Sequence, residues 1–315
     1  MIRFVFLLIW LSAPIQAALE QSATAQAPPW PVFVDADWLA ENLTQPRVKL
    51  IEISDEVSYE FDGHIPGAVP AGKEYWREQG DDGVRTHLPI SDLQDRVRTL
   101  GIDDGDHVVL YYKGHSVNEI QGTFYAYWIF DLLGHDAVSI LDGGWHAWQA
   151  AGGEMDETKV DPTPGDFTAR HRPKLEMGVD VLHSLYRNHP VVDGRPHAYW
   201  LGSDKYDANI KYGRVPGSLS QPWESFLKRD ADGLTYADAA VPIGLLEQHP
   251  LDKQALVLLT CFGAGGAAID YAFFKAAGFE RLRLDDEGYK RWNLRDYPLE
   301  KGEPSPANTA EGGGT

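Results

Sequence analysis

The sequence predicts an α/β protein built from two similar domains in tandem. Short apolar segments, rich in β-branched and aromatic residues, alternate with segments of helical length, and the same order of segments returns about 145 residues further along the chain. With 315 residues, 43% of them hydrophobic, the chain is long enough for two ordinary domains with cores of their own.

The first repeat supplies strands that alternate with helices. VFVDADWLAENL, from residue 32, indicates a strand start followed by a short helix, and VKLIEIS (48–54) is typical of a buried strand. HVVLYY (107–112) predicts a second buried strand, and residues 120–134 have helical length and end at a glycine. The AVSILDGGWHAW segment that follows adds another strand and a turn. Strands connected through helices in this way pair in parallel.

The second repeat echoes the first at three places. GHIPGA (63–68) returns as GRVPGS (213–218), HVVLYY returns as ALVLLT (255–260), and LLGHDAVSILDGGWHAW returns as AAGFERLRLDDEGYKRW (276–292). The stretch between the repeats is polar and contains prolines, which indicates a linker. The predicted boundaries are 1–27 for a signal peptide and disordered start, 31–152 for the first domain, 153–174 for the linker, 175–300 for the second domain and 301–315 for a disordered tail.

The amino terminus has the layout of a secretory signal peptide. Arg3 precedes an apolar run at residues 4–11, and small residues follow at Ala13, Ala17 and Ala18. The apolar run is well short of the ~20 residues that span a bilayer. We therefore expect a soluble protein that is periplasmic or secreted.

The charge of the chain excludes some partners. The formal net charge of −19 comes without any run of clustered lysine and arginine. Binding to a nucleic acid backbone or to an anionic membrane needs such clusters. We expect neither nucleic acid nor membrane as a partner.

The single cysteine of the chain is a candidate reactive group. Exported domains use cysteines in pairs for disulfides, whereas Cys261 has no second cysteine to pair with. It follows a predicted buried strand and precedes a helix predicted over 267–277, with the segment FGAGG between them. Glycines there let backbone N–H groups curl inward, and the helix start adds partial positive charge, so this segment is an anion cradle that should favour the thiolate. The alternative is a small buried hydrophobe.

These residues together resemble the rhodanese-type sulfurtransferases, the thiosulfate and 3-mercaptopyruvate group. The resemblance rests on the tandem repeat, on GHIPGA with its GRVPGS partner, on LDGGWHAW and on a six-residue loop headed by cysteine, and it extends over residues 32–297. It implies a five-stranded parallel sheet flanked by helices in each domain, with an inactive first domain and a catalytic second one. The position equivalent to Cys261 falls near Tyr112 or Lys113, neither of which can carry a sulfane sulfur.

The resemblance also implies a mechanism. The Cys261 thiolate attacks the outer sulfur of a donor, and the resulting persulfide passes its sulfur to a thiophilic acceptor such as cyanide or a thiol. No metal and no organic cofactor is implied. The loop amides that would hold the negative charge belong to Phe262, Gly263, Ala264, Gly265, Gly266 and Ala267.

The donor stays open at this point. Thiosulfate users resemble CRKGVT and mercaptopyruvate users resemble CGSGVT, whereas this chain has CFGAGG, with neither cations nor serine. Phe262 offers an apolar rim. Arg195 in VVDGR and Arg214 in GRVPGS are candidates to bind a substrate carboxylate. A structural ion pair is the alternative for Arg195.

Three further hypotheses concern function and surface. A phosphatase of the same fold is disfavoured. Its loop is one residue longer and is closed by an arginine, whereas residue 267 of this chain is alanine. A non-catalytic binding or sulfur-relay module of the same fold is the alternative to an enzyme. The acidic residues 285–287 are predicted to form a solvated loop, with tuning of the thiol or partner binding as the alternative.

Overall fold

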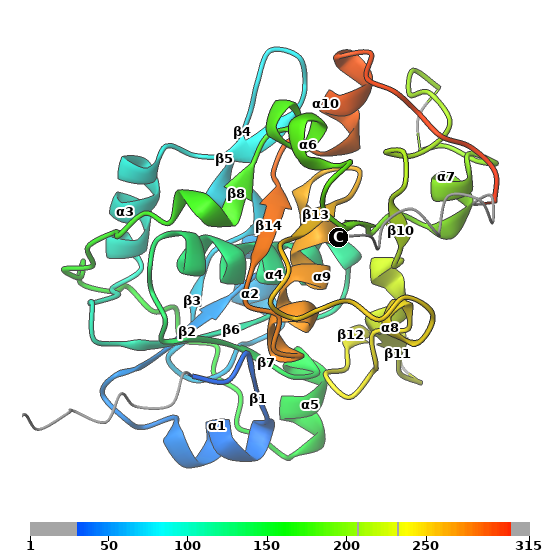
Figure 1. The fold of residues 1–315 in the computed structure, drawn as a ribbon. Coiled ribbons are helices and arrows are strands. Elements are labelled where there is room, and N and C mark those ends of the chain that lie inside the picture. The colour runs from blue at the N-terminus through cyan, green and yellow to red at the C-terminus, as the bar shows by residue number, and fades with distance from the viewer. Residues whose placement is uncertain (1–29, 207, 232, 304–315) are drawn as a thin grey trace, which may run out of the picture.

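The computed structural model describes residues 30–206, 208–231 and 233–303. The predicted signal peptide lies outside these residues, as does the end of the predicted tail. The described chain is organised around two five-stranded sheets, each flanked by helices (Figure 1). The predicted fold class is therefore confirmed. Among the described helices, none has the length and apolar character needed to cross a membrane.

The first sheet is entirely parallel. Its strand order is β1 (Phe33–Val34), β7 (Val138–Leu141), β6 (His107–Tyr111), β2 (Val48–Glu52) and β3 (Val69–Pro70). The helices of this domain are α1 (Ala36–Asn42), α2 (Glu56–Phe61), α3 (Ile90–Thr99), α4 (Val117–Leu132) and α5 (Gly144–Ala150).

The second sheet repeats this topology. Its strand order is β8 (Glu176–Met177), β14 (Leu282–Asp285), β13 (Val257–Thr260), β9 (Val191–Asp193) and β10 (Leu219–Ser220), again parallel throughout. The helices are α6 (Val179–Leu185), α7 (His197–Leu201), α8 (Leu245–Gln248), α9 (Ala264–Ala276) and α10 (Gly288–Leu294). Because each strand holds the same place in its sheet as its counterpart, the two halves share one architecture.

Each half also carries a small antiparallel hairpin that the sequence did not predict. In the first, a 3₁₀ helix, η1 (Lys73–Trp76), leads into β4 (Arg77–Gln79) and β5 (Arg85–His87). In the second, η3 (Trp223–Phe226) leads into β11 (Leu227–Arg229) and β12 (Thr235–Ala237). Strands of three residues are too short to give a periodic signal, which is why these hairpins escaped prediction.

The strands alternate their side chains between two hydrophobic layers. In β6, Val109 and Tyr111 face the layer beneath α1 and α5, whereas Val108 and Leu110 face the layer that contains α4. In β13, Leu258 packs with α6 and α10, and Leu259 packs with α9. This alternation is the two-residue period of a strand.

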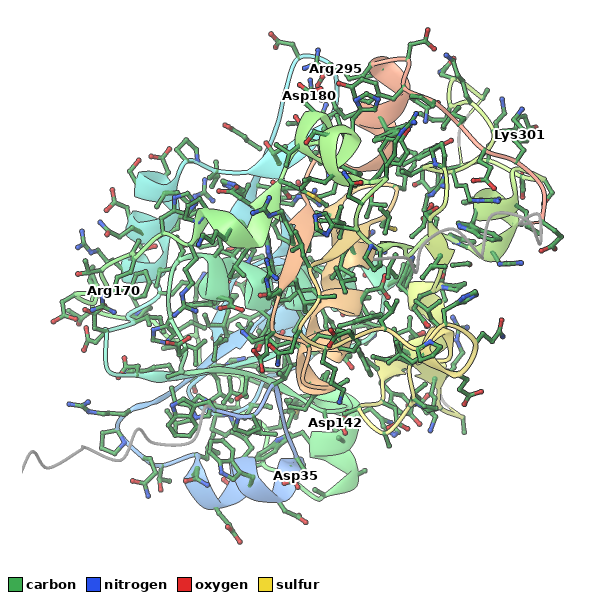
Figure 2. All side chains as sticks on the ribbon, viewed as in Figure 1. Asp35, Asp142, Arg170, Asp180, Arg295 and Lys301 are labelled. Atoms are coloured by element: carbon green, nitrogen blue, oxygen red, sulfur yellow. The ribbon has the colours of Figure 1, made fainter. Side chains whose placement is uncertain are left out.

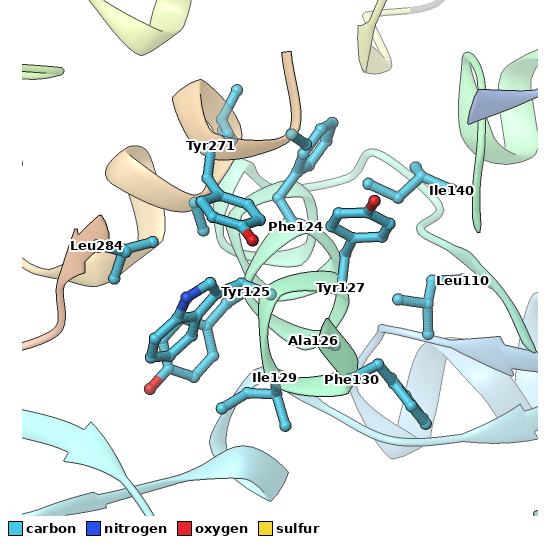
Figure 3. Close-up of a cluster of buried hydrophobic side chains, with 14 of the residues drawn as sticks. Leu110, Phe124, Tyr125, Ala126, Tyr127, Ile129, Phe130, Ile140, Tyr271 and Leu284 are labelled. Carbon is cyan, nitrogen blue, oxygen red and sulfur yellow. The ribbon is translucent and has the colours of Figure 1, made fainter. Parts of the chain in front are cut away.

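Helix α4 forms the centre of the molecule, where it packs against α9. Its start is fixed by Ser116, whose side chain accepts a hydrogen bond from the amide of Glu119. Figure 3 shows side chains that radiate from α4 in every direction, with Tyr271 and Leu284 of the second domain beside it. A helix that is apolar all round is a buried one. One continuous core therefore joins the two domains.

The segment predicted as a linker packs on the first domain. Asp156 and His64 exchange backbone hydrogen bonds of 2.9 and 2.8 Å, and the amide of Arg170 donates to the Leu133 carbonyl at 2.7 Å. Phe167 is buried.

The charged side chains that Figure 2 labels, such as Asp35, Arg170 and Asp180, lie at the periphery.

Candidate active site

The cysteine of the chain lies at the carboxyl end of a central strand in the second sheet. Cys261 directly follows β13, and two residues separate it from α9. Its carbonyl accepts a 2.8 Å hydrogen bond from the amide of Tyr289 in α10, which holds the backbone in place. The residue is 4% exposed, and it lines a cleft. Its thiol is therefore buried but accessible from that cleft.

The segment after Cys261 is shorter than the sequence indicated. Helix α9 begins at Ala264, three residues before the predicted start at 267, so Gly265 and Gly266 belong to its first turn. No glycine of this segment has a positive φ, and the predicted inward curl of a glycine-rich loop is wrong. The amides of a first helical turn have no partner within the helix and carry partial positive charge, so an anion-binding element remains.

The glycines are instead required by space. A Cβ atom at Gly266 would lie 2.6 Å from the Cys261 sulfur and 2.6 Å from Cδ1 of Trp223. A Cβ atom at Gly265 would lie 3.0 Å from Oε1 of Gln121, which belongs to the first domain. The bare backbone of α9 therefore lets the sulfur and the opposing domain approach the helix start closely.

The resting thiol is protonated at neutral pH. Burial raises the pKa of Cys261, and the carboxylates of Asp193 and Asp270 raise it further. The amide of Phe262 and the guanidinium of Arg195 act in the opposite direction but do not outweigh burial. The prediction that this segment favours the thiolate is therefore wrong, because burial of the sulfur outweighs the amides and Arg195.

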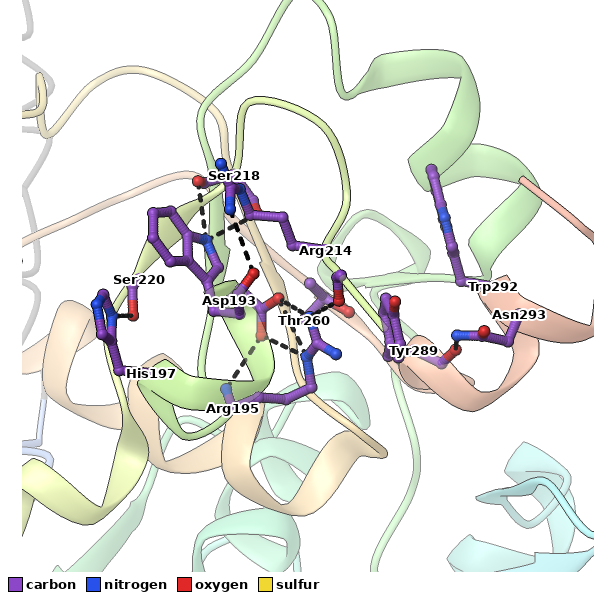
Figure 4. Close-up of polar contacts among 12 residues, drawn as sticks. Asp193, Arg195, His197, Arg214, Ser218, Ser220, Thr260, Tyr289, Trp292 and Asn293 are labelled. Atoms are coloured by element: carbon purple, nitrogen blue, oxygen red, sulfur yellow. Dashed lines mark hydrogen bonds and ion pairs between the residues drawn. The ribbon is translucent and has the colours of Figure 1, made fainter. Parts of the chain in front are cut away.

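Arg195 lies beside the sulfur as the sequence suggested, but its donors are occupied. It follows β9, where its Nε and Nη2 atoms bind the two oxygens of Asp193 at 2.9 and 2.5 Å, and Nη2 also donates to the Gly213 carbonyl at 3.0 Å (Figure 4). The guanidinium lies 3.6 Å from the ring centre of Tyr289. Arg195 lines the cleft, so its charge contributes to the site while its hydrogen bonds hold the site together.

Arg214 does not line the cleft, and the structure corrects its assignment as a candidate substrate clamp. Its guanidinium is buried and lies 3.9 Å from the ring centre of Trp200. It donates to Oε1 of Glu300 at 2.6 Å and to the Gly302 carbonyl at 2.7 Å. Arg214 therefore anchors the carboxyl-terminal end of the domain. Within the GRVPGS motif, Arg214 therefore has a packing role, because residues 300–302 lie against its guanidinium.

Asp270 is a buried acid that the sequence analysis missed. It lies in α9 one turn after Gly266, is fully buried, and neither carboxyl oxygen has a hydrogen-bond partner among the described residues. Burial raises its pKa well above the usual range, and Asp193 and Glu224 raise it further. Burial therefore favours the protonated form of this carboxyl group. The signal that could have found it is a single acid within the apolar sequence AAIDYAFF.

The acidic residues 285–287 are not a solvated loop, and that prediction is wrong. Asp285 accepts hydrogen bonds from the Thr260 hydroxyl at 2.8 Å and from the Gly288 amide at 3.1 Å, so it connects β13 to the start of α10. Asp286 accepts bonds of 2.7 Å from the amide of His87 and from the hydroxyl of Tyr125, both in the first domain. Two of the three acids are therefore buried connectors.

The cleft around Cys261 has walls from both domains and a volume of about 570 Å³. The second domain supplies the first turn of α9 together with Arg195, Trp223 and Lys290. The first domain supplies a set of polar and charged side chains that no motif had indicated: Lys73, Arg77, Gln79, Arg85, Asn118 and Gln121. Because these residues approach only through folding, local sequence patterns could not reveal them.

An aromatic rim borders the cleft. Phe262 lines it, as predicted, and its ring centre lies 4.3 Å from that of Tyr206, a largely exposed residue. Trp223 lines the same cleft next to Gly266. Aromatic rings therefore border the sulfur, while charged side chains of both domains line the rest of the cleft.

Comparison with known proteins agrees with this arrangement. A family model described as a rhodanese-like domain matches residues 35–151, the first of the two halves. The 3-mercaptopyruvate sulfurtransferase of Escherichia coli K12 is 26% identical over 281 residues, which cover 85% of this chain and 97% of that protein. A putative thiosulfate sulfurtransferase of Mycolicibacterium smegmatis is 29% identical over 281 residues, covering 86% and 98%. Both halves are thus matched over nearly the full length of these relatives.

The chain carries a rhodanese-like domain and is homologous over both halves to 3-mercaptopyruvate and thiosulfate sulfurtransferases. The crystal structure of SseA from Escherichia coli, described as a 3-mercaptopyruvate sulfotransferase with the rhodanese fold, superposes with a TM-score of 0.68 at 22% identity, covering 82% of this chain and 99% of that one. At this identity the superposition supports the fold alone. Within this sulfurtransferase, the second half carries the cysteine, and a small-molecule sulfur donor and acceptor are its substrates.

Proposed function

We propose that this sulfurtransferase takes a sulfane sulfur from thiosulfate or 3-mercaptopyruvate, carries it as a persulfide on Cys261, and delivers it to a thiol or to cyanide. The observation that supports this most directly is the position of the Cys261 thiol, in the cleft and against the first turn of α9. Helix starts bind anions, and a persulfide is an anion at neutral pH.

The reaction has two displacement steps. Donor binding first displaces water from the cleft, and the Cys261 thiol loses its proton to solvent. The thiolate then attacks the outer sulfur of the donor and forms an S–S bond. The electron pair of the broken bond leaves with sulfite when the donor is thiosulfate, or with the enolate of pyruvate, which takes up a proton, when it is 3-mercaptopyruvate. An acceptor thiolate or cyanide next attacks the outer sulfur of the persulfide, and the Cys261 thiolate departs.

The first-turn amides of α9 support the charged states of this cycle. The amides of residues 262–267 are the nearest backbone donors in sequence to the sulfur, and Gly266 provides the space for a second sulfur atom because it lacks a side chain. Arg195 adds positive charge while its bonds to Asp193 keep it fixed. The protein therefore stabilises the persulfide with fixed dipoles and one fixed cation.

We further propose that the protein is exported to the periplasm or secreted. The support is the sequence of the amino terminus, where Arg3, an apolar run and small residues follow one another. The amino-terminal residue of the mature protein, determined by mass spectrometry of material from the host cell, tests this. A mature chain that still begins at residue 1 would contradict it.

Intact-protein mass tests the proposed chemistry. Purified protein is exposed to thiosulfate and, separately, to 3-mercaptopyruvate, alongside the Cys261→Ala variant. We expect a gain of about 32 Da, one sulfur atom, which cyanide or a thiol removes and which the variant never shows. A protein that gains no sulfur from either donor would favour the alternative of a non-catalytic binding module. Phosphate release from aryl phosphates serves as the control for the phosphatase alternative.

A further inference from the structure

We propose that Lys73 of the first domain binds the oxyanion of the sulfur donor, so that the half without a cysteine selects the substrate. The substrate class is a small donor that bears a sulfonate or carboxylate group close to the transferable sulfur. This inference rests on the proposed function, and it assigns the cation that the loop of the second domain lacks.

The position of Lys73 carries the proposal. It is the first residue of η1 and lines the same cleft as Cys261. Its Nζ atom donates to Oδ1 of Asn118 at 2.9 Å and to Oε1 of Gln121 at 3.2 Å. Gln121 in turn contacts the start of α9, since its Oε1 lies 3.0 Å from where a Cβ of Gly265 would be. The ammonium group is thus held beside the helix turn that faces the sulfur.

The partners of Lys73 leave its charge available. Both are neutral amide oxygens, and an ammonium group has three N–H donors, so a third donor remains for a ligand. An anion placed between this donor and the α9 amides would complete two sets of unsatisfied donors at once.

The other cations of the cleft are differently engaged. Arg85 forms a 2.5 Å ion pair with Glu74, and Arg195 forms one with Asp193. Lys290 donates to the Gly83 carbonyl at 2.6 Å, and Arg77 donates to the Arg85 carbonyl at 3.0 Å and lies over the ring of Tyr125. These contacts direct their N–H groups to the hairpin or to acids. Among the cleft cations of the described chain, Lys73 is the one held by side-chain amides alone.

The surroundings of Lys73 also favour anion binding. Burial lowers the pKa of Lys73 to about 8, and the neighbouring Arg77 and Arg85 contribute in the same direction, against Glu74 and the Cys261 sulfur. The charged form of Lys73 is therefore poorly compensated by the protein alone. A bound oxyanion supplies that compensation, so Lys73 should bind the donor below pH about 8, where it is protonated, and donor binding should raise its pKa.

A matched pair of alkylating reagents tests this without requiring sulfur transfer. The Cys261 sulfur displaces iodide from iodoacetate and from iodoacetamide by the same chemistry, but only the first reagent has a carboxylate. The rate ratio of the two reagents is measured at pH 7 for the wild type, Lys73→Met, Lys73→Arg and the surface control Lys159→Met. We expect Lys73→Met to lower the iodoacetate-to-iodoacetamide ratio by about 10- to 100-fold, the usual effect of losing a hydrogen bond to a charged group. Lys73→Arg should retain most of the ratio, and Lys159→Met all of it.

Two further readouts separate donor binding from effects on the thiol. Lys73→Met should raise KM for thiosulfate more than it lowers kcat, and the wild-type ratio should fall above pH about 8, whereas that of Lys73→Arg should not. A ratio that Lys73→Met leaves unchanged overturns the proposal, whatever happens to sulfur transfer. A ratio that falls in a protein that gains no sulfur from either donor supports the anion site and overturns the proposed function instead.

Discussion

The two halves of the molecule place different residues at the same point of one fold. Tyr112 follows β6 as Cys261 follows β13, and the amides of Trp145 and Tyr289 donate to their carbonyls at 2.9 and 2.8 Å respectively. Tyr112 is therefore the equivalent of the cysteine, one of the two positions that the sequence had suggested. Its hydroxyl oxygen accepts a 2.7 Å hydrogen bond from the amide of Ala237 in the second domain. The same structural position therefore holds the candidate reactive cysteine in one half and a residue that contacts the other domain in the other half.

The strand beside this point carries a buried acid in both halves. Glu52 ends β2 as Asp193 ends β9, and each has a cation next to it. Lys113 lies 3.6 Å from Glu52 and donates to the Ser58 carbonyl at 2.6 Å, whereas Arg195 binds Asp193 through two nitrogens. A buried acid paired with a cation is therefore common to both halves. The reactivity depends on the residue next to this pair, which is Tyr112 in one half and Cys261 in the other.

The central helices, α4 and α9, also share one residue type and differ in another at equivalent positions. Helices α4 and α9 end with matching hydrogen bonds, from Gly134 to the Asp131 carbonyl and from Gly278 to the Lys275 carbonyl, both 2.9 Å. At equal distances from these ends, Gly122 corresponds to Gly266, and Ala126 corresponds to Asp270. The glycine is therefore present at this position in both halves, whereas the position of Asp270 is occupied by an alanine in α4.

The largest contrast is expected when the two equivalent positions are changed separately. Cys261→Ser should lower sulfur transfer by at least about 1000-fold with little change in stability, since it removes the nucleophile and little volume. Tyr112→Phe should leave transfer nearly intact but lower the free energy of unfolding by about 1–3 kcal/mol, because the buried Ala237 amide loses its acceptor. Steady-state kinetics and urea unfolding measure both. A Tyr112→Phe variant as inactive as Cys261→Ser would contradict an inactive first half.

The two equivalent glycines should separate activity from packing. In Gly266→Ala the new methyl group would meet the sulfur at 2.6 Å, so we expect transfer to fall by about 100-fold, the typical cost of a displacement near 1 Å. In Gly122→Ala it would meet Ile53 at 2.9 Å and Lys73 at 3.0 Å, so we expect a loss of about 1–3 kcal/mol of stability and, through Lys73, a loss of activity smaller than that of Gly266→Ala. Equal losses of activity in both variants would argue against a site built around Gly266.

The buried acid should make the stability of the protein depend on pH. Because its pKa is raised, Asp270 keeps its proton in the folded state at pH values where the unfolded chain has lost it, so its contribution to stability falls as pH rises above about 4. Asp270→Asn removes this dependence. We expect its stability relative to the wild type to increase by about 1–3 kcal/mol between pH 4 and pH 8. Parallel pH profiles in urea unfolding would show that the carboxyl group is ionised and compensated.

A smaller effect is expected at the contact between the first domain and β8. Burial alone would lower the pKa of His87, but its 2.7 Å bond to Glu176 and the charge of Asp286 raise the pKa to about 9. This stabilisation is complete below pH about 6.5, the unfolded value, and is lost as pH rises through 9. His87→Gln should therefore cost on the order of 1–2 kcal/mol at pH 6 and almost nothing at pH 10. The same cost at both values would mean that packing, not charge, holds this contact.

The sequence predicted the features that depend on local pattern. The repeats, the long strands such as β6 and β13, and the strand-to-helix position of Cys261 follow from hydrophobic periodicity and from one echoed motif. The start of α9 was placed three residues late because glycines at 265 and 266 are poor helix formers, and tertiary contact overrides that preference.

Features that depend on distant contacts could not be predicted. Lys73 approaches Cys261 only after the two halves pack, and no spacing along the chain encodes that approach. Arg214, Asp285 and Asp286 carry charge, which favours a surface or a ligand in sequence analysis, yet each is buried against a partner from a remote segment. The raised pKa of Cys261 has the same origin, since the depth of burial is a property of the packed fold.

The bond from the Ala237 amide to Tyr112 has a consequence for how such a protein can change over generations. A duplicated domain that has lost its reactive residue is ordinarily free to decay or be deleted. Here the position equivalent to the cysteine holds a strand of the second half, and residues such as Gln121 and Lys73 form a wall of its cleft. Deleting the first half would therefore remove a domain contact and part of the site at the same time.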